Sequence, residues 1–405
     1  MLCDSRSGVL NTHEVGLKRI RRTHVVIPPV RCGTRQHLAA LRLVNRAFCR
    51  SASPWLFRHI NAKSSSSPAI PSLERLMKLS KSPYATYVYQ IDFGFEKSLS
   101  SNADIYIEDL KECHPSLLVK FTNLKALEFH EPPSSLPQAQ KTAYMNTVIS
   151  ILRYVPLPNL TELVIKFPIT YDFSRFFPSR INSLQIPIED VVKHLRHLGL
   201  SVCAFTDSAD SRYRQTSIVP EYAALPNNIY APHLFRMVES ASNLESLILS
   251  SVNILDIDII AFPSSLCLQS LYLGGVSISS RNLLALINQS AHKIKYVNFC
   301  LLKLQSGTWQ EVLLQMCELP HLLDINIDCS GYSLTGSSSH LADRLPPIPG
   351  YCPNIETMHD LDLNALGNLQ WRVNSNRISI GLQPFSDTDY RHINEPSVGF
   401  GGDRL

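Results

Sequence analysis

The chain has 405 residues, a length that suits a small module joined to a larger one, or an elongated repeat, more than a single core. Hydrophobic residues make up 44% of it and charged residues 18%, a composition that excludes an intrinsically disordered protein. The net charge of +4 is unevenly distributed, because residues 1–60 hold eleven Lys and Arg against only Asp4 and Glu14. We expect residues 1–36 to form a basic, unstructured leader. A nucleic-acid partner is not expected, since no interleaved aromatic residues accompany these arginines.

The compartment is predicted from what the chain lacks. No run of 18 uncharged apolar residues exists, and no apolar segment near the N-terminus has the form of a secretory signal. The ten cysteines include no C-x-x-C pair, the spacing that a metal or redox motif needs. The sequence therefore predicts a cytoplasmic or nuclear protein with no membrane partner, no metal and no cofactor.

Residues 37–60, HLAALRLVNRAFCRSASPWLFRHI, combine two local patterns. Apolar residues at spacings of three and four predict one stripe on a helix, and they are Leu38, Leu41, Val44, Phe48 and Ala52. Ser53 and Pro54 then predict a new helix start, because serine caps helices and proline fits their first turn. Three large apolar side chains follow: Trp55, Leu56 and Phe57.

The order of these residues resembles the second half of an F-box, as found in fungal F-box proteins. The resemblance implies a helical module over 37–63 that docks on the Skp-type adaptor of a cullin–RING ubiquitin ligase, followed by a Ser/Pro linker over 64–71. The positions that it assigns to the adaptor contact and to the core of the module are Leu38, Leu41, Leu43, Val44, Phe48, Pro54, Trp55, Leu56 and Phe57.

A second pattern, apolar-x-x-apolar-x-apolar, recurs nine times after residue 85. Its copies start at Val88, Leu124, Leu160, Leu195, Leu244, Leu268, Ile294, Leu322 and Ile355. In a strand, positions four and six of each copy share the inward face, while positions three, five and seven point outward. The motif resembles that of leucine-rich repeats. The Asn or Cys that normally follows three residues after the last Leu is present only as Cys203, with Ser330 as a substitute.

Helix-like segments alternate with these copies, and they are Ser72–Leu79, Asp104–Leu110, Thr142–Tyr154, Pro232–Ser240, Arg281–Ser290 and Thr308–Leu319. Because one strand–helix unit cannot cover its own apolar face, neighbouring units must stack. The predicted fold class is therefore α/β: an irregular leucine-rich-repeat solenoid over 72–363, with parallel strands on the concave face and helices on the convex face. Residues 364–405 are expected to form a cap or a flexible tail.

We predict a binding surface rather than an active site. The chain has neither the phosphate-binding G-x-x-x-x-G-K nor the dinucleotide-binding G-x-G-x-x-G, and His194 and His197 on one strand would face opposite sides and could not share a metal ion. Outward strand residues of a solenoid line its concave face, where Tyr and Asn offer adaptable contacts. The predicted substrate-binding set is Glu128, His130, Lys166, Tyr272, Tyr296, Asn298, Asp324, Asn326 and Asp328.

Together these patterns favour a substrate-recruiting F-box subunit that binds the Skp-type adaptor and cullin scaffold at one end and a protein substrate along the solenoid. Such a subunit catalyses nothing and raises the local concentration of its substrate. The alternative is a stand-alone leucine-rich-repeat scaffold with no role in a ubiquitin ligase. It stays open because residues 31–36 hold no counterpart of the L-P-x-E helix and D-L turn that open an F-box.

Overall fold

The computed structural model describes residues 32–64, 72–95, 103–133, 135–178, 185–203, 227–342 and 354–385. Residues 1–31 of the expected leader, most of the Ser/Pro linker and the last twenty residues lie outside this part of the chain. The described residues form one apolar core that runs without interruption from Ala62 to Val373.

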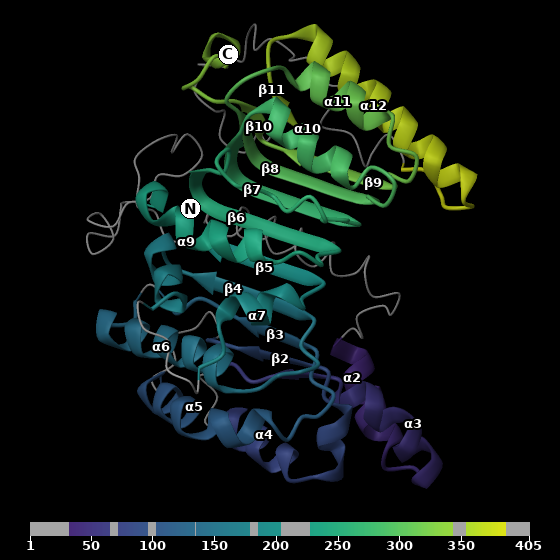
Figure 1. Cartoon of the computed structure of the whole chain (residues 1–405). Coiled ribbons are helices and arrows are strands. Elements are labelled where there is room, and N and C mark those ends of the chain that lie inside the picture. The colour runs from purple at the N-terminus through teal and green to yellow at the C-terminus, as the bar shows by residue number, and fades with distance from the viewer. Residues whose placement is uncertain are drawn as a thin grey trace, which may run out of the picture.

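One sheet of eleven strands spans the molecule, and its described pairings are all parallel (Figure 1). The strands are β1 (His59–Asn61), β2 (Gln90–Phe93), β3 (Ala126–Phe129), β4 (Glu162–Phe167), β5 (His197–Val202), β6 (Ser246–Asp256), β7 (Ser270–Ile278), β8 (Tyr296–Leu304), β9 (Asp324–Asp328), β10 (Ser330–Tyr332) and β11 (Ile355–Glu356). They pair in sequence order from β1 to β8, after which β8 pairs with both β9 and β10. Eight of the nine motif copies coincide with strands, from β2 to β9. The ninth copy is confirmed only at its start, because β11 ends at Glu356, Met358 is 74% exposed and Asp360 begins α12.

Helices alternate with the strands along the chain. They are α2 (Cys32–Leu41), α3 (Arg46–Phe57), α4 (Ser72–Ser80), α5 (Ala103–Leu118), α6 (Gln138–Tyr154), α7 (Ile188–Lys193), α9 (Asn227–Ser240), α10 (Ser280–Gln289), α11 (Trp309–Cys317) and α12 (Asp360–Ser379), with 3-10 turns η1 (Pro83–Tyr87), η2 (Thr170–Phe176) and η4 (Ser339–Leu341). Figure 1 places α4 to α6 beside the first strands and α10 to α12 beside the last. The predicted α/β class, with parallel strands in a solenoid-like stack, is confirmed.

Successive strands keep one register over the motif positions, so the same position repeats from turn to turn. The pairing of β6 with β7 shifts register after the motif, between Ser250 and Leu255. Leu127 pairs with Leu163, Leu163 with Leu198 and Leu198 with Leu247. All four side chains are buried. Burying a leucine contributes about 2 kcal/mol, and this row therefore binds each turn to the next. Residues between the buried positions point to the other side of the sheet. This side is here called the helix-free face, because none of the described helices lies on it (Figure 1).

Asparagines at the start of three turns add a second ladder. Their side-chain amides donate to backbone carbonyls of the preceding turn: Asn123 to Thr86 at 2.7 Å, Asn159 to Thr122 at 2.9 Å and Asn243 to Lys193 at 2.8 Å. Each asparagine stands directly before the leucine that opens a motif copy. Ser330, which was expected to replace the Asn or Cys that follows the strand of a leucine-rich repeat, also bonds to the preceding turn. Its hydroxyl accepts the Leu302 N–H at 3.2 Å. The ladder thus lies mainly before the strands rather than after them.

The N-terminal segment differs from the prediction. A single helix through residues 38–52 is wrong, because Asn45 caps a new helix by accepting the Phe48 N–H at 3.0 Å. A helix start at Ser53 and Pro54 is also wrong, since both lie inside α3, where the Ser53 hydroxyl donates to the Cys49 carbonyl at 2.6 Å. Helix α2 begins within the expected leader, and β1 lies within the segment expected to be a helical module, ahead of the Ser/Pro segment.

Helix α12 covers the last turns of the sheet, in a segment that the sequence left open as cap or tail. Its buried Asp362 carboxylate accepts the Gln310 N–H at the start of α11 and the Tyr332 hydroxyl at the end of β10, both at 2.8 Å. Its Asn376 amide donates to two backbone carbonyls just after α11. These contacts satisfy polar groups that the last turn would otherwise expose.

The asparagine ladder predicts the effect of Asn159→Ala. The variant loses one hydrogen bond between turns and keeps the strand, so the free energy of unfolding falls by about 1 kcal/mol, measured by urea denaturation. Gln138→Ala is the matched control, because the exposed Gln138 amide makes no hydrogen bond among the described residues and its loss leaves stability unchanged. Equal stability of the two variants would contradict the ladder.

Candidate functional site

Helices α2 and α3 pack together beside the first strands and leave large apolar side chains in solvent (Figure 1). Leu43 is 88% exposed, Val44 64%, Phe48 45% and Trp55 44%. Phe48 and Trp55 lie seven residues apart on α3 and therefore on one stripe of the helix. Of the other residues in the predicted adaptor set, Leu41 is also exposed, and Leu38, Pro54, Leu56 and Phe57 are half-buried. Contiguous exposed apolar side chains mark interaction surfaces.

The turn between α2 and α3 is fastened to the first repeat by aromatic stacking. The Arg42 guanidinium lies 4.7 Å from the centre of the Phe57 ring and 4.8 Å from that of Tyr84 in η1. The two rings also stack on each other at 4.8 Å. A cation held by two rings contributes on the order of 1 kcal/mol, and β1 follows α3 straight into the sheet. The exposed apolar surface is therefore held in a fixed orientation to the strands.

The second candidate surface is the helix-free face at β1 to β4, where acidic side chains meet. Asp92 and Glu128 are register partners on adjacent strands, and both are buried. Like charges in that position repel, and each carboxylate has a compensating neighbour. The His59 ring lies 2.8 Å from Asp92, and the Lys166 ammonium lies 3.3 Å from Glu128. The carboxylates are thus held by groups from β1 and β4.

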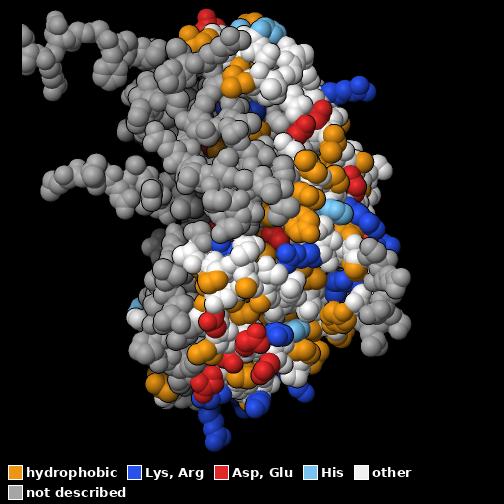
Figure 2. Space-filling model, turned by 90° about the vertical axis from the view of Figure 1, so that its left-hand side faces the viewer, with side chains coloured by type: hydrophobic (Ala, Val, Ile, Leu, Met, Phe, Trp, Pro, Cys, Tyr) orange, Lys and Arg blue, Asp and Glu red, His pale blue; other side chains and the backbone are white. Residues whose placement is uncertain are grey.

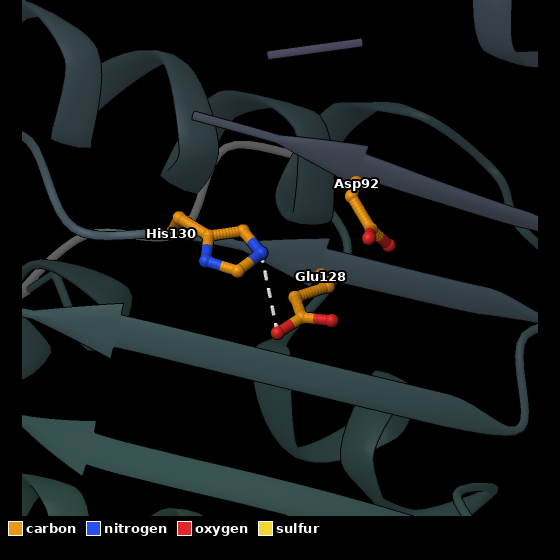
Figure 3. Close-up of side chains that lie close together, drawn as sticks. All are labelled: Asp92, Glu128 and His130. Atoms are coloured by element: carbon orange, nitrogen blue, oxygen red, sulfur yellow. Dashed lines mark ion pairs between the residues drawn. The ribbon is translucent and has the colours of Figure 1, made fainter. Parts of the chain in front are cut away.

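His130 follows β3 and turns its ring toward both carboxylates (Figure 3). Its Nε2 lies 3.2 Å from Glu128, and its Nδ1 lies 3.5 Å from the Lys166 ammonium. An ammonium can only donate, so Nδ1 accepts and the ring proton is assigned to Nε2. Gly94 allows this position, because a Cβ there would lie 2.6 Å from the His130 Cβ. Burial, helped by Lys166, lowers the pKa of His130 to about 4, so the ring is neutral at pH 7.

The ligand atoms of Asp92, Glu128 and His130 lie within 4.8 Å of one another, which is close enough for them to share one metal ion. A cation would compete with the Lys166 ammonium for Glu128 and with the proton on the Nε2 of His130. Lys166 already supplies the positive charge that the carboxylates need. The group therefore fits an ion-pair cluster better than a metal centre.

The predicted substrate-binding residues separate into two groups along the sheet. Glu128, His130 and Lys166 belong to the cluster at β3 and β4, and the others lie on β7 to β9: Tyr272, Tyr296, Asn298, Asp324, Asn326 and Asp328. Register places three of the second group in one row, because Tyr272 pairs with Asn298 and Asn298 with Asn326. On the strands between the groups, the row of Tyr272 continues through Ile248 and Gly199, and the row of Lys166 continues through Ser201 and Ser250.

Tyr272 lies where predicted on the strand but is only 1% exposed. Its ring folds along the strand over Gly274, where an added Cβ would come within 2.8 Å of the ring carbon Cε1. Ile248 on the adjacent strand packs against it. Truncating this side chain would therefore cost stability, and it is not suited to be a probe of surface binding.

Sequence reasoning missed three members of the β1–β4 cluster: His59, Gln90 and Asp92. The signal for Asp92 was present, because it occupies position five of the first motif copy, between Ile91 and Phe93. His59 gave no signal, since β1 carries no copy of the motif.

No protein-family model matches this chain, and none of the curated proteins matches it either. Among the described residues, no helix combines the length and the apolar character needed to cross a bilayer.

The buried ring of His130 predicts a pH dependence of stability. Its pKa is about 4 in the folded chain against about 6.5 in the unfolded chain, so the unfolded state binds more protons between these values. The neutral ring therefore contributes up to about 3 kcal/mol to the free energy of unfolding. This contribution is fully present above pH 6.5 and is lost as the pH falls toward 4. His130→Gln removes it, measured by urea unfolding from pH 7 to pH 4. Buried Asp172 has a raised pKa of about 6 and changes stability with pH in the opposite direction. Because Asp172 is present in the natural chain and in the variant, its effect cancels in the difference between them.

The ion-pair cluster predicts the cost of Lys166→Met. The substitution leaves Glu128 buried without its ammonium, and the free energy of unfolding falls by about 3 kcal/mol. Lys78→Met is the matched control, because Lys78 pairs with Glu74 in solvent, where such a pair is worth about 0.5 kcal/mol. Adding Glu128→Gln to Lys166→Met restores much of the loss. Independent, additive effects of the two substitutions would show that the pair is not coupled.

Proposed function

We propose that this protein is the substrate-recruiting subunit of a Skp–cullin–F-box ubiquitin ligase. The observation that carries the proposal is the exposed apolar surface of α2 and α3, where Leu43, Val44, Phe48 and Trp55 stand in solvent. These are residues that the resemblance to an F-box assigns to adaptor docking. A monomeric protein gains nothing from exposing them, whereas a partner groove would bury them at about 25 cal/mol per Å².

The stack of strands supplies the second half of the proposal. Its parallel, sequence-ordered strands and outer helices have the arrangement expected of a leucine-rich-repeat solenoid. A bound substrate and the adaptor would then be held on one rigid body, because Arg42 and β1 attach α2 and α3 to the first repeat. The chain would act by raising the effective concentration of the substrate beside the ubiquitin-charged enzyme.

Phe48→Ala with Trp55→Ala tests the proposal. The double variant loses two large anchors and binds purified Skp-type adaptor at least tenfold more weakly than the natural chain, measured by isothermal titration calorimetry. Phe48 is 45% exposed and Trp55 44%, so the double variant also loses some packing, and urea unfolding is measured beside adaptor binding to show that the variant stays folded.

Ile105→Ala is the control, because Ile105 is an exposed apolar residue on α5, outside the docking surface. Full adaptor binding by the double variant would place the contact elsewhere. No adaptor binding by the natural chain would favour the stand-alone leucine-rich-repeat scaffold.

A further inference from the structure

A cysteine and a histidine from neighbouring turns meet just before the strands β7 and β8. The Cys267 sulfur lies 3.4 Å from Nε2 of His292, within the hydrogen-bonding distance of a thiol. Cys267 is half-buried and His292 is exposed, so solvent reaches the pair. An imidazole in contact with a thiol can take up the thiol proton and stabilise the thiolate, which is the nucleophilic form of cysteine. The pair is therefore a candidate for covalent chemistry.

Cys267 occupies the position at which other turns carry an asparagine of the ladder. It stands directly before the leucine that opens the sixth motif copy, where the fifth copy has Asn243. Each ladder amide reaches the carbonyl two residues before the preceding copy, which for Cys267 belongs to Ser242. The Ser265 hydroxyl donates to that carbonyl instead, at 3.0 Å. The bond between the two turns is thus made without Cys267, and its thiol contacts the following turn.

The backbone holds the cysteine and the histidine next to each other. The hydroxyl of buried Ser290, at the end of α10, accepts the N–H of Leu268, next to Cys267, at 2.8 Å. The Ser290 carbonyl accepts the N–H of Lys293, next to His292, at 2.9 Å. One buried residue therefore fixes both segments, and the contact between sulfur and ring is built into the turn.

Other thiols of the described residues have different surroundings. Burial raises the pKa of Cys113 to about 11 and also raises the pKa of Cys317, so these thiols are protonated and weakly nucleophilic at pH 7. Cys49 is the competing thiol, because the Ser53 hydroxyl, 3.8 Å from its sulfur, and then the Arg42 guanidinium lower its pKa. Neither of these two groups can take up a proton at pH 7. The imidazole distinguishes Cys267 from Cys49.

The charge around the pair suits an acidic reaction partner. Exposed Lys293 follows His292 directly. Figure 2, which faces the left-hand side of Figure 1, shows Asp and Glu side chains gathered toward the lower end of the molecule. Figure 1 places α10, which ends three residues before His292, in the upper half. An anion that approaches the pair is therefore kept away from that group of carboxylates.

We propose that Cys267 is a modification site for a small acidic disulfide, with His292 as the base. The thiol proton passes to Nε2 of His292, and the Cys267 thiolate attacks one sulfur of the disulfide. A bond forms between these two sulfurs, the original disulfide bond breaks, and the leaving thiolate takes the proton from the imidazolium. The Cys267 sulfur is oxidised and the leaving sulfur is reduced, so the reaction needs no other oxidant. This inference is independent of the proposed function.

The test treats the full chain with oxidised glutathione at pH 7 and follows the mixed disulfide at each cysteine by mass spectrometry of peptides. Cys267 is expected to react more than about tenfold faster than Cys113 and Cys317. His292→Asn is expected to slow the reaction at Cys267 by about fivefold, because an amide cannot take up the proton. His194→Asn is the matched control, since His194 is also exposed and also stands directly before a motif leucine. Its rate at Cys267 is expected to equal that of the natural chain.

Urea unfolding of His292→Asn shows whether the variant keeps its fold. Imidazole added to the folded variant is expected to restore part of the rate at Cys267, which a purely structural role of His292 would not allow. Faster reaction at Cys49 than at Cys267 would overturn the proposal. So would equal rates at Cys267 in the natural chain and in His292→Asn. Neither result bears on adaptor binding, so the proposed function is tested separately.

Discussion

The constant register of the motif positions on successive parallel strands is the constraint on which the structure depends. It brings the buried aliphatic side chains of neighbouring turns side by side, from Ile91 on β2 to Ile325 on β9, and so turns a local motif into a continuous core. The same register decides what happens on the helix-free face. It sets Asp92 beside Glu128, which forces the sequence to provide Lys166 and His59 as compensation. The polar cluster is thus a consequence of the fold as much as a feature of a surface.

The stack of strands has two ends, and the helices that lie at them differ in the side chains that they expose. At the last turn, α12 satisfies the backbone through Asp362 and Asn376, which is a structural task. At the first turn, α2 and α3 are fastened through Arg42 but keep Leu43 and Trp55 in solvent. An end helix needed only as a cap would carry a polar outer face. The apolar outer face of the first end differs from that of a cap and supports the docking role that we propose for it.

The sequence predicted those parts of the fold that rest on repeated spacing. Eight of the nine motif copies became strands, because period-two burial survives even where loops differ in length, while the ninth keeps only the two residues of β11. Prediction failed where one local interaction outweighed the pattern. The stripe from Leu38 to Ala52 suggested one helix, but the Asn45 cap starts a new one. Strand β1 has no motif of its own and is recruited by pairing with β2. The segment of helix α12 was left open as cap or tail, because exposed Trp371 and Ile378 interrupt its amphipathic pattern.

The candidate surfaces, like the fold, were predictable only as far as repeated spacing and residue order determine them. Alternation placed Glu128 and Tyr272 correctly on one face of the sheet, but it carries no information on depth, and both proved to be buried. The α2–α3 surface was found through residue order, and its exposure could come only from the structure. Arg42 and Arg58 stack on aromatic rings and fix the two helices against the first repeat. A pre-organised surface loses less entropy on binding, so this attachment would favour the docking role that we propose for α2 and α3.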